Sequence, residues 1–217
     1  MKAIVLLSGG IDSATALYWC KKRGWTIYAL TFDYEREQSV DLKAAASLAR
    51  TAGVKKHIVV DVDFYKKLRG SPSASKDKII DANSGISGAY VPARNIVFLG
   101  IAAAYAETTG SKVIVTGHNR EDRDRFPDAS KKFFETFNKI FKLGLKSSRS
   151  QVVLKVLTPL GNLTKLQVLS KAIELDVPLK ATWSCYNNGA EPCGVCYGCK
   201  SREHAFLALG IKDPQTG

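Results

Sequence analysis

The sequence contains no apolar run long enough for a membrane-spanning helix, which needs about 20 predominantly apolar residues. Its N-terminal apolar run, residues 3–7, is shorter than the hydrophobic region of a secretory signal peptide. A glycine-rich turn follows this run directly, and no small-residue cleavage site is present. We therefore expect a cytoplasmic protein that does not act at a membrane.

A disulfide framework is not expected either. The chain has five cysteines, an odd number, and it lacks a secretory signal. Cys20 lies on the apolar side of an expected helix, where we predict that it is part of the core. The other four cysteines lie together in the last fifth of the chain. They need a different explanation.

Dense blocks of lysine and arginine are absent, although the chain is basic overall. It has 32 Lys and Arg against 20 Asp and Glu, a formal charge of +12. Such an excess favours nucleotide phosphates in a cleft or nucleic acid along a face. Lysines that simply face water are the alternative. With 217 residues, of which 45% are hydrophobic, the chain can bury the core of one α/β domain.

Short apolar strands alternate with helical patterns along the chain. The strands are rich in Ile and Val with little polar alternation, which is typical of a parallel sheet covered on both faces. We therefore predict an α/β fold with a doubly wound, mostly parallel sheet and with ligands at the carboxyl ends of its strands. The expected strands are 2–7, 26–32, 56–62, 112–116 and 152–156, and the expected helices are 12–22, 40–52 and 92–108.

Three segments depart from this alternation. Residues 69–90 are rich in Ser, Gly, Lys and Asp, and we expect a mobile lid or a disordered loop there. Residues 126–144 read as a basic helical insertion, whose aromatic stripe favours a core or a subunit interface over a ligand platform. The tail, residues 213–217, is expected to fray. The aromatic stripe consists of Phe133, Phe134, Phe137 and Phe141.

The glycine turn after the first strand is the densest functional signal. Exposed amides at the start of the following helix, together with the helix dipole and two serine hydroxyls, predict a pyrophosphate site. The string is neither a Walker A loop nor the GxGxxG dinucleotide fingerprint. The alternative is a plain strand–turn–helix connection with a capping residue. The string reads Ser8-Gly9-Gly10-Ile11-Asp12-Ser13.

The four C-terminal cysteines have the spacing of a metal site. Tetrahedral zinc requires four converging ligands, and two overlapping CxxC turns supply three of them here. Four thiolates leave no open position, which predicts a structural Zn²⁺ rather than one that activates water. An iron–sulfur cluster, which the same ligands could hold, is the alternative. The predicted ligands are Cys185, Cys193, Cys196 and Cys199.

These motifs resemble those of a known family. The glycine string matches the SGGxDS motif of the PP-loop ATP pyrophosphatases. Five further strings resemble the 7-cyano-7-deazaguanine synthase family within that group, in the family's order and over nearly the whole chain. The chain resembles this family or a divergent paralogue of it. The strings are VPARN at 91–95, TGHNRED at 116–122, TPL at 158–160, and the cysteine segments at 182–186 and 193–199; FPD at 126–128 is a weaker echo.

Two short segments differ from the family pattern. Where the family usually reads DYGQRH, residues 33–38 read DYEREQ, so a glycine and a histidine are replaced and carboxylates are added. Where the family often reads PDCR, this chain has DASK at 128–131. Both segments fall near the expected substrate pocket. We therefore expect these differences to affect the identity of the acceptor amine and of the product, and not the cleavage of ATP.

The resemblance implies a fold like that of the adenine-nucleotide α-hydrolases and a ligase that forms carbon–nitrogen bonds while cleaving ATP to AMP and pyrophosphate. The implied substrates are 7-carboxy-7-deazaguanine, ammonia and ATP, the implied intermediate is an acyl adenylate, and the implied product is 7-cyano-7-deazaguanine. Mg²⁺, Zn²⁺ and a homodimer are also implied. Residues 1–180 would form the nucleotide-binding domain, and 181–210 a zinc-binding segment packed on it.

The resemblance also implies roles for individual residues. Four polar residues are candidates for catalysis, and the glycine string with one lysine is the candidate nucleotide site. Simpler interpretations remain, namely a solvent-facing arginine, loop caps and an exposed helix lysine; a lone loop histidine, His118, is more often solvated than catalytic. The catalytic candidates are Asp12, Arg94, Asn119 and Asp122, and the nucleotide candidates are Ser8, Gly9, Gly10, Ile11, Asp12, Ser13 and Lys165.

Other functions are also considered. A paralogue could stop at an amide or join the acid to another amine, including one on a protein, and the altered segment at 33–38 favours this possibility. A PP-loop enzyme that modifies tRNA is favoured by the basic charge and opposed by the lack of a distinct RNA-binding domain, so nucleic acid is not expected as a direct substrate. A zinc module without enzyme activity is the remaining alternative.

Overall fold

A computed structural model describes residues 1–34, 40–67, 90–149 and 153–215 of the chain. The loop expected at 69–90 therefore lies, apart from its last residue, outside the described residues. The altered positions 35–38 lie outside them as well.

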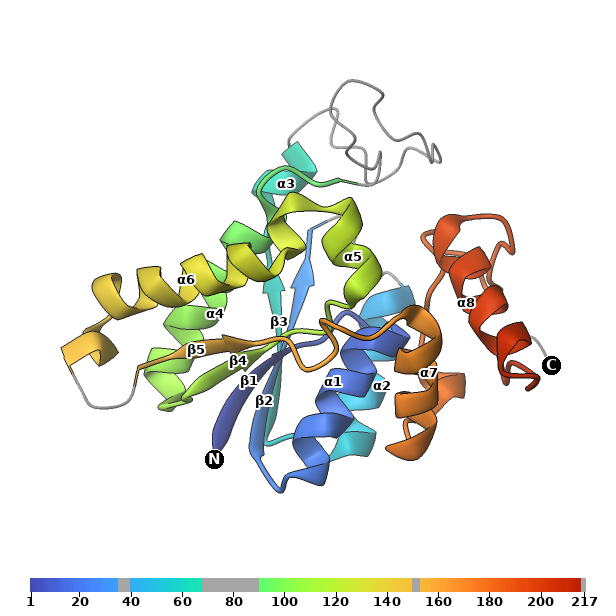
Figure 1. Cartoon of the computed structure of the whole chain (residues 1–217), viewed down its shortest axis with the longest axis horizontal. Coiled ribbons are helices and arrows are strands. Elements are labelled where there is room, and N and C mark those ends of the chain that lie inside the picture. The colour runs from blue at the N-terminus through green and yellow to red at the C-terminus, as the bar shows by residue number, and fades with distance from the viewer. Residues whose placement is uncertain (35–39, 68–89, 150–152, 216–217) are drawn as a thin grey trace.

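The centre of the molecule is a five-stranded parallel sheet with the strand order β3-β2-β1-β4-β5 (Figure 1). All five expected strands are present, and the prediction of a doubly wound parallel sheet is confirmed. The last strand starts later than expected, because residues 153 and 154 precede the hydrogen-bonded ladder. The strands are β1 Lys2–Leu6, β2 Thr26–Asp33, β3 Lys56–Asp61, β4 Val113–Val115 and β5 Lys155–Leu157.

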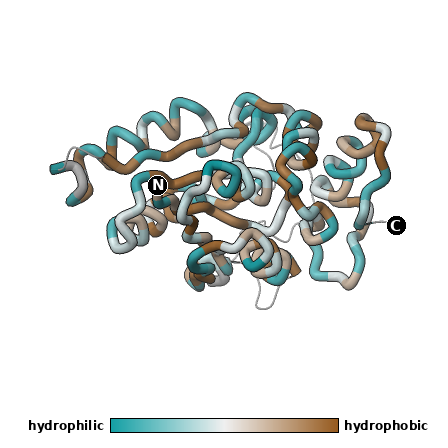
Figure 2. Tube along the Cα trace, turned by 90° about the horizontal axis from the view of Figure 1, so that it is seen from below, coloured by the Kyte–Doolittle hydropathy of each residue, from teal (hydrophilic) through white to brown (hydrophobic). Residues whose placement is uncertain are grey.

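Helices cover both faces of this sheet, and the central strand shows why. Ala3 and Val5 pack against α1, α2 and α7, whereas Ile4, between them, packs against α4 and α6; all three side chains have no exposed surface. In Figure 2 the strands run as hydrophobic segments through the centre, and the helices around them alternate between hydrophobic and hydrophilic turns. A strand buried on both faces needs apolar residues at every position, as the sequence has.

The helices follow the strands in chain order. No helix of the described segments combines the length and apolarity that crossing a bilayer requires. The α-helices are α1 Ile11–Lys22, α2 Val40–Ala52, α3 Phe64–Lys67, α4 Arg94–Thr109, α5 Arg120–Arg125, α6 Lys131–Gly144, α7 Lys165–Glu174 and α8 Tyr197–Ala208, and the 3₁₀ turns are η2 Pro127–Ala129, η3 Lys146–Arg149 and η4 Leu179–Ala181.

The long helix α4 begins two residues later than the sequence suggested. Ala93 precedes it in a left-handed conformation, with φ of 55°, so Pro92 is in a turn and not in the first helical turn. Such a conformation costs a residue other than glycine about 1–2 kcal/mol. It sets the direction in which Arg94, the first helical residue, leaves the turn.

The aromatic stripe belongs to the core. Phe134, Phe137 and Phe141 on α6 are at most 7% exposed and pack in the same apolar cluster as α4 and the sheet, while Phe133 is partly buried beside them. This outcome confirms that the stripe packs in the core. Cys20 is fully buried as expected, and burial raises the pKa of its thiol to about 12.

The expectation that the tail frays is wrong for residues 213–215, and residues 216 and 217 lie outside the described residues. Asp213 is 8% exposed and accepts two hydrogen bonds from the buried Arg202 guanidinium, at 2.6 and 2.8 Å. Gln215 donates from its side chain to the Thr182 carbonyl at 2.9 Å. The tail is ordered through residue 215 because a buried arginine needs a charged partner, and Asp213 supplies it.

Candidate active site

The turn between β1 and α1 places two glycines in different conformations. Gly9 has a φ of 88°, and a Cβ there would collide with the Asp41 carbonyl oxygen. Gly10 has an ordinary φ of −78°, and a Cβ there would lie 3.6 Å from the Trp183 carbonyl oxygen, a normal contact. Only the first glycine is therefore required by the conformation of the turn itself.

The start of α1 offers backbone amides to a ligand. Its N-cap residue is Gly10, and no side chain of the described residues caps the helix. The Ser8 amide and hydroxyl both lie 3.1 Å from Ser13 Oγ, which donates to the Gly10 carbonyl at 3.1 Å. The serines thus hold the turn in shape, and the helix start, which no described side chain caps, favours an anion.

Asp12 and Lys165 meet at this turn although they are 153 positions apart. Lys165 Nζ, at the start of α7, donates to Asp12 Oδ2 at 2.6 Å. The side chains are only 26% and 16% exposed, so the interpretation of Lys165 as an exposed helix lysine is wrong. Asp12 Oδ1 is buried and has no hydrogen-bond partner among the described residues. A buried carboxylate oxygen without a partner is suited to a cation.

Asn119 and Asp122 form the N-cap of α5. Asn119 Oδ1 accepts from the amides of Glu121 and Asp122, at 2.8 and 3.1 Å, and Asp122 Oδ2 accepts from the Asn119 amide at 3.0 Å. The structure therefore shows the loop caps that the simpler interpretation predicted. The two residues also lie beside Asp12: burial raises the pKa of Asp12, Lys165 opposes the shift, and the charge of Asp122 adds to it.

Gly117, which was not singled out from the sequence, allows these segments to meet. A Cβ at Gly117 would lie 2.7 Å from the Ser13 amide nitrogen and 2.8 Å from the Asp12 carbonyl carbon. The loop after β4 therefore packs directly on the first turn of α1. The signal was available in the string at 116–122, but a glycine in a loop does not reveal which backbone it approaches.

Arg94 contacts Tyr34, and its charge also acts on Asp122 and His118. Its Nη1 donates to the Tyr34 hydroxyl at 3.3 Å, and its guanidinium carbon lies 6.0 Å from the centre of that ring. The interpretation of Arg94 as a solvent-facing residue is therefore wrong. The next residue, Asn95, is 5% exposed; Asp128 Oδ2 accepts from its backbone amide at 3.2 Å and the Asp128 carbonyl accepts from its side chain at 2.9 Å.

His118 is held on both ring nitrogens. Its Nε2 lies 3.1 Å from Asn95 Nδ2, a donor, and its Nδ1 lies 3.0 Å from Thr116 Oγ1. Burial, aided by the charge of Arg94, lowers the pKa of His118 to about 4. The ring is therefore neutral at physiological pH, with Nε2 as acceptor and Nδ1 as donor. It is not the solvated loop histidine that we considered.

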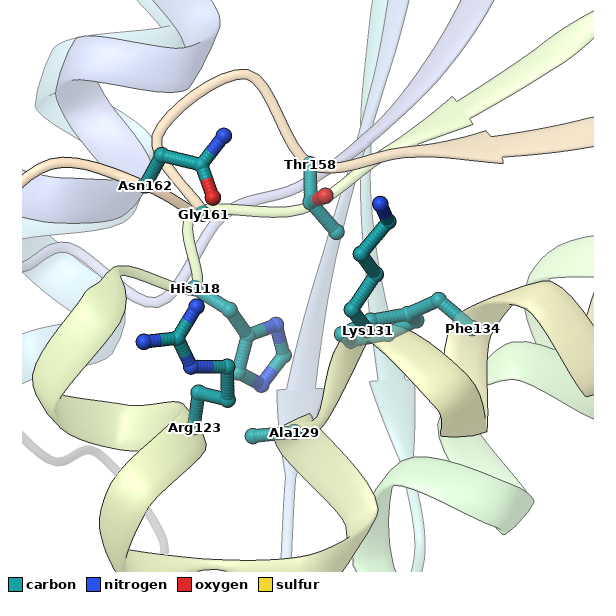
Figure 3. Close-up of a pocket in the computed structure, with 8 residues that line it drawn as sticks. All are labelled: His118, Arg123, Ala129, Lys131, Phe134, Thr158, Gly161 and Asn162. Atoms are coloured by element: carbon teal, nitrogen blue, oxygen red, sulfur yellow. The ribbon is translucent and has the colours of Figure 1, made fainter.

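Two cavities adjoin this region. The first, of about 110 Å³, lies at the ends of β4 and β5 (Figure 3), and the second, of about 380 Å³, lies between the start of α7 and the helix α8. Lys165 lines the second cavity. The residues lining the first are His118, Arg123, Ala129, Lys131, Phe134, Thr158, Gly161 and Asn162.

The four predicted metal ligands converge. The four sulfur atoms lie within 4.8 Å of one another, and two sulfur pairs are 4.0 Å apart. A tetrahedral zinc centre with bonds of 2.3 Å needs sulfurs about 3.8 Å apart. Backbone amides donate to these sulfurs at 3.3–3.5 Å, and the amides of Val195 and Cys196 lower the pKa of Cys193 to about 6. The cluster can hold a metal ion.

The cysteine segment is anchored to the turn after β1. The Trp183 amide, two residues before Cys185, donates to the Gly9 carbonyl at 2.8 Å. Arg202 on α8 holds the same stretch by donating to Thr182 Oγ1 at 2.7 Å. A Cβ on Gly198 would collide with the Ser184 carbonyl oxygen, so α8 packs closely on this stretch. The position of the turn is therefore linked to that of the cysteine cluster.

Comparisons with known proteins agree with this geometry. Residues 2–210 match the family described as queuosine biosynthesis protein QueC. The chain is 40% identical over 222 residues to 7-cyano-7-deazaguanine synthase of Trichormus variabilis, covering 99% of this chain and 97% of that protein. It is 37% identical over 219 residues to the synthase of Aliarcobacter butzleri, with 98% and 94% covered. The solved structure of NMN synthetase from Francisella tularensis has the same fold, with a TM-score of 0.53 at 19% identity, covering 97% of this chain and 77% of that one.

The depressed pKa of His118 predicts a pH dependence of stability. Between about pH 6.5 and pH 4, His118 is protonated in the unfolded chain but stays neutral in the folded protein. The free energy of unfolding therefore falls as pH falls through this window. We expect a loss on the order of 2 kcal/mol relative to His118→Gln, which lacks this titration. Urea denaturation of both proteins at pH 7 and near pH 4 measures it. Equal declines in the two proteins would show that the folded ring takes up a proton normally.

Proposed function

The chain belongs to the QueC family of queuosine biosynthesis proteins, and we propose that it makes 7-cyano-7-deazaguanine from 7-carboxy-7-deazaguanine, ammonia and ATP. The proposal rests on one structural observation above all. Asp12 and Lys165 meet at the uncapped start of α1, next to the end of β1. The helix start suits an anion, and Asp12 Oδ1, which has no hydrogen-bond partner among the described residues, suits a cation. This location is the one at which doubly wound sheets bind ligands.

The protein is an enzyme, and we propose that it is a ligase. A carboxylate oxygen of the acid attacks the α-phosphorus of ATP, pyrophosphate leaves, and an acyl adenylate forms. Ammonia attacks the acyl carbon, AMP leaves with one carboxylate oxygen, and the amide results after loss of a proton. The amide oxygen then attacks the α-phosphorus of a second ATP and pyrophosphate leaves. The adenylated oxygen departs with the second AMP, and the nitrogen loses its two protons to give the nitrile.

We assign binding of the triphosphate to the α1 amides and to Lys165. The amides and the positive end of the helix dipole stabilise the leaving pyrophosphate. Lys165 Nζ pairs with Asp12 in the structure and can turn to a phosphate once a cation neutralises that carboxylate. The unpartnered Asp12 Oδ1 and the neighbouring Asp122 are suited to Mg²⁺, which would neutralise phosphate charge when bound.

We propose that the cysteine cluster holds Zn²⁺. The four sulfurs are close to tetrahedral spacing and leave no position for a substrate, so the ion would contribute structure and no reaction step. Its effect on the reaction would be indirect, through the Trp183 amide that bonds to the Gly9 carbonyl. This division of labour supports a nucleotide-binding domain over 1–180 and a zinc-binding segment over 181–210.

We further propose that the enzyme works in the cytoplasm as a homodimer, as the family resemblance implies. The second candidate function, coupling of the acid to an amine other than ammonia, is favoured by the altered segment at 128–131. There Ala129 and Lys131 line the cavity at the ends of β4 and β5. A protein acceptor would be one such amine.

The product identifies the reaction. With the acid, ammonia, ATP and Mg²⁺, we expect the nitrile with two AMP and two pyrophosphate per turnover, read by mass spectrometry.

Asp12→Asn is expected to reduce kcat by at least about tenfold, since it removes a charge that binds Mg²⁺. Accumulation of the amide alone, or coupling only to another amine, would favour the second candidate. A protein that forms no AMP but binds tRNA tightly at low salt would contradict both.

Metal content tests the cysteine site. We expect one zinc ion per chain by elemental analysis, and its loss in Cys193→Ser, because three thiolates cannot complete the tetrahedral site. Cys20→Ala is the matched control, since Cys20 is a buried core thiol outside the cluster, and it should keep the metal. The zinc-free variant should also bind ATP more weakly, because the Trp183 contact to Gly9 loosens. Iron with acid-labile sulfide in place of zinc would overturn the assignment.

A further inference from the structure

We propose that the cavity at the ends of β4 and β5 binds a planar aromatic carboxylic acid, with Arg123 and Lys131 as the residues that bind its anionic group and with His118 and Phe134 facing its ring (Figure 3). The inference rests on the proposed function and adds the location and the binding groups of the acid. From the sequence, Lys131 was placed only in an altered segment near the expected substrate pocket, Phe134 was assigned to the core, and Arg123 was not singled out.

The position of the cavity suits a reaction partner of ATP. Thr158 directly follows β5, and His118 follows β4 by three residues. The residue before His118, Gly117, touches the first turn of α1. The connection after β1 runs through α1 on one face of the sheet, and the connection after the neighbouring β4 runs through α6 on the other face. This edge is therefore the switch point where ligands bind. The cavity and the proposed phosphate site therefore adjoin the same loop, through His118 and Gly117 respectively.

The charge of the cavity favours an anion. Of the residues that line it, two are cations, and none carries a carboxylate. Arg123 pairs at 3.2 Å with Asp124, and Lys131 lies 3.8 Å from Glu135, but both acidic side chains are about 60% exposed. Such surface ion pairs contribute little, about 0–1 kcal/mol. Both cations can exchange these partners for a ligand, and a guanidinium can bind a carboxylate through two parallel hydrogen bonds.

The walls and size of the cavity favour a small, flat ligand. The rings of His118 and Phe134 lie 5.2 Å apart, and hydrogen bonds from Asn95 and to Thr116 fix the imidazole orientation. Asn162 can pair with polar edges of a heterocycle. The volume of about 110 Å³ is below the 300–1,000 Å³ of typical pockets for drug-sized ligands, so the cavity suits a small ring system and not a whole nucleotide.

Binding of 7-carboxy-7-deazaguanine, measured by calorimetry with a non-hydrolysable ATP analogue present, tests the assignment. We expect Arg123→Gln and Lys131→Gln each to raise the Kd of the acid at least tenfold and to leave the Kd of the ATP analogue unchanged. Arg120→Gln and Lys132→Gln are the matched controls, because both cations are exposed and outside the cavity; their acid affinity should equal that of the wild type.

A steric variant gives a second measurement. Ala129 is 4% exposed and lines the cavity, so Ala129→Leu should fill it, abolish binding of the acid and preserve binding of the ATP analogue. Wild-type protein that binds the acid, together with cavity variants that bind it equally well, would overturn the assignment of this cavity alone. Wild-type protein that neither binds nor consumes the acid would overturn the proposed function and this inference with it.

Discussion

The backbone of the turn between β1 and α1 is in contact with three other parts of the chain, and these contacts decide where a ligand can bind. The start of α2 approaches Gly9 so closely that no Cβ fits, Gly117 packs on the first turn of α1, and the Trp183 amide bonds to the Gly9 carbonyl. Each contact is made by backbone atoms. In the proposed reaction, this rigid backbone would need no reorganisation to stabilise a phosphate, which is the condition for effective electrostatic catalysis.

The same contacts would give the cysteine cluster an indirect role in the proposed reaction. Arg202 donates a hydrogen bond to Thr182, in the stretch that leads into Cys185, and its guanidinium also binds the carboxylate of Asp213 near the C-terminus. The stretch at 182–183 is therefore joined to α8, to the C-terminal tail and to the turn between β1 and α1. A metal bound by the four cysteines would restrain these contacts, whereas the proposed nucleotide site lies at the edge of the sheet.

Much of this arrangement could be predicted from the sequence, because it depends on local pattern. Buried strands appear as apolar runs, the glycine turn as a short string, and the metal ligands as cysteines at fixed spacing. The Asp12–Lys165 pair was less accessible, because its members are 153 positions apart. Residues such as Gly117 and Arg123 could not be assigned, since their importance depends on which backbone or cavity they meet. The ordered tail was missed because its partner, Arg202, is buried only in the folded chain.

The central claim is that the turn after β1 binds the phosphates of ATP with a cation at Asp12. The direct measurement is the affinity for a non-hydrolysable ATP analogue with Mg²⁺ and with chelator, in the wild type and in Asp12→Asn. The wild type should bind at least tenfold more tightly with Mg²⁺, and the variant should keep the chelator affinity while losing the enhancement. An equal enhancement by Mg²⁺ in the variant would contradict the claim.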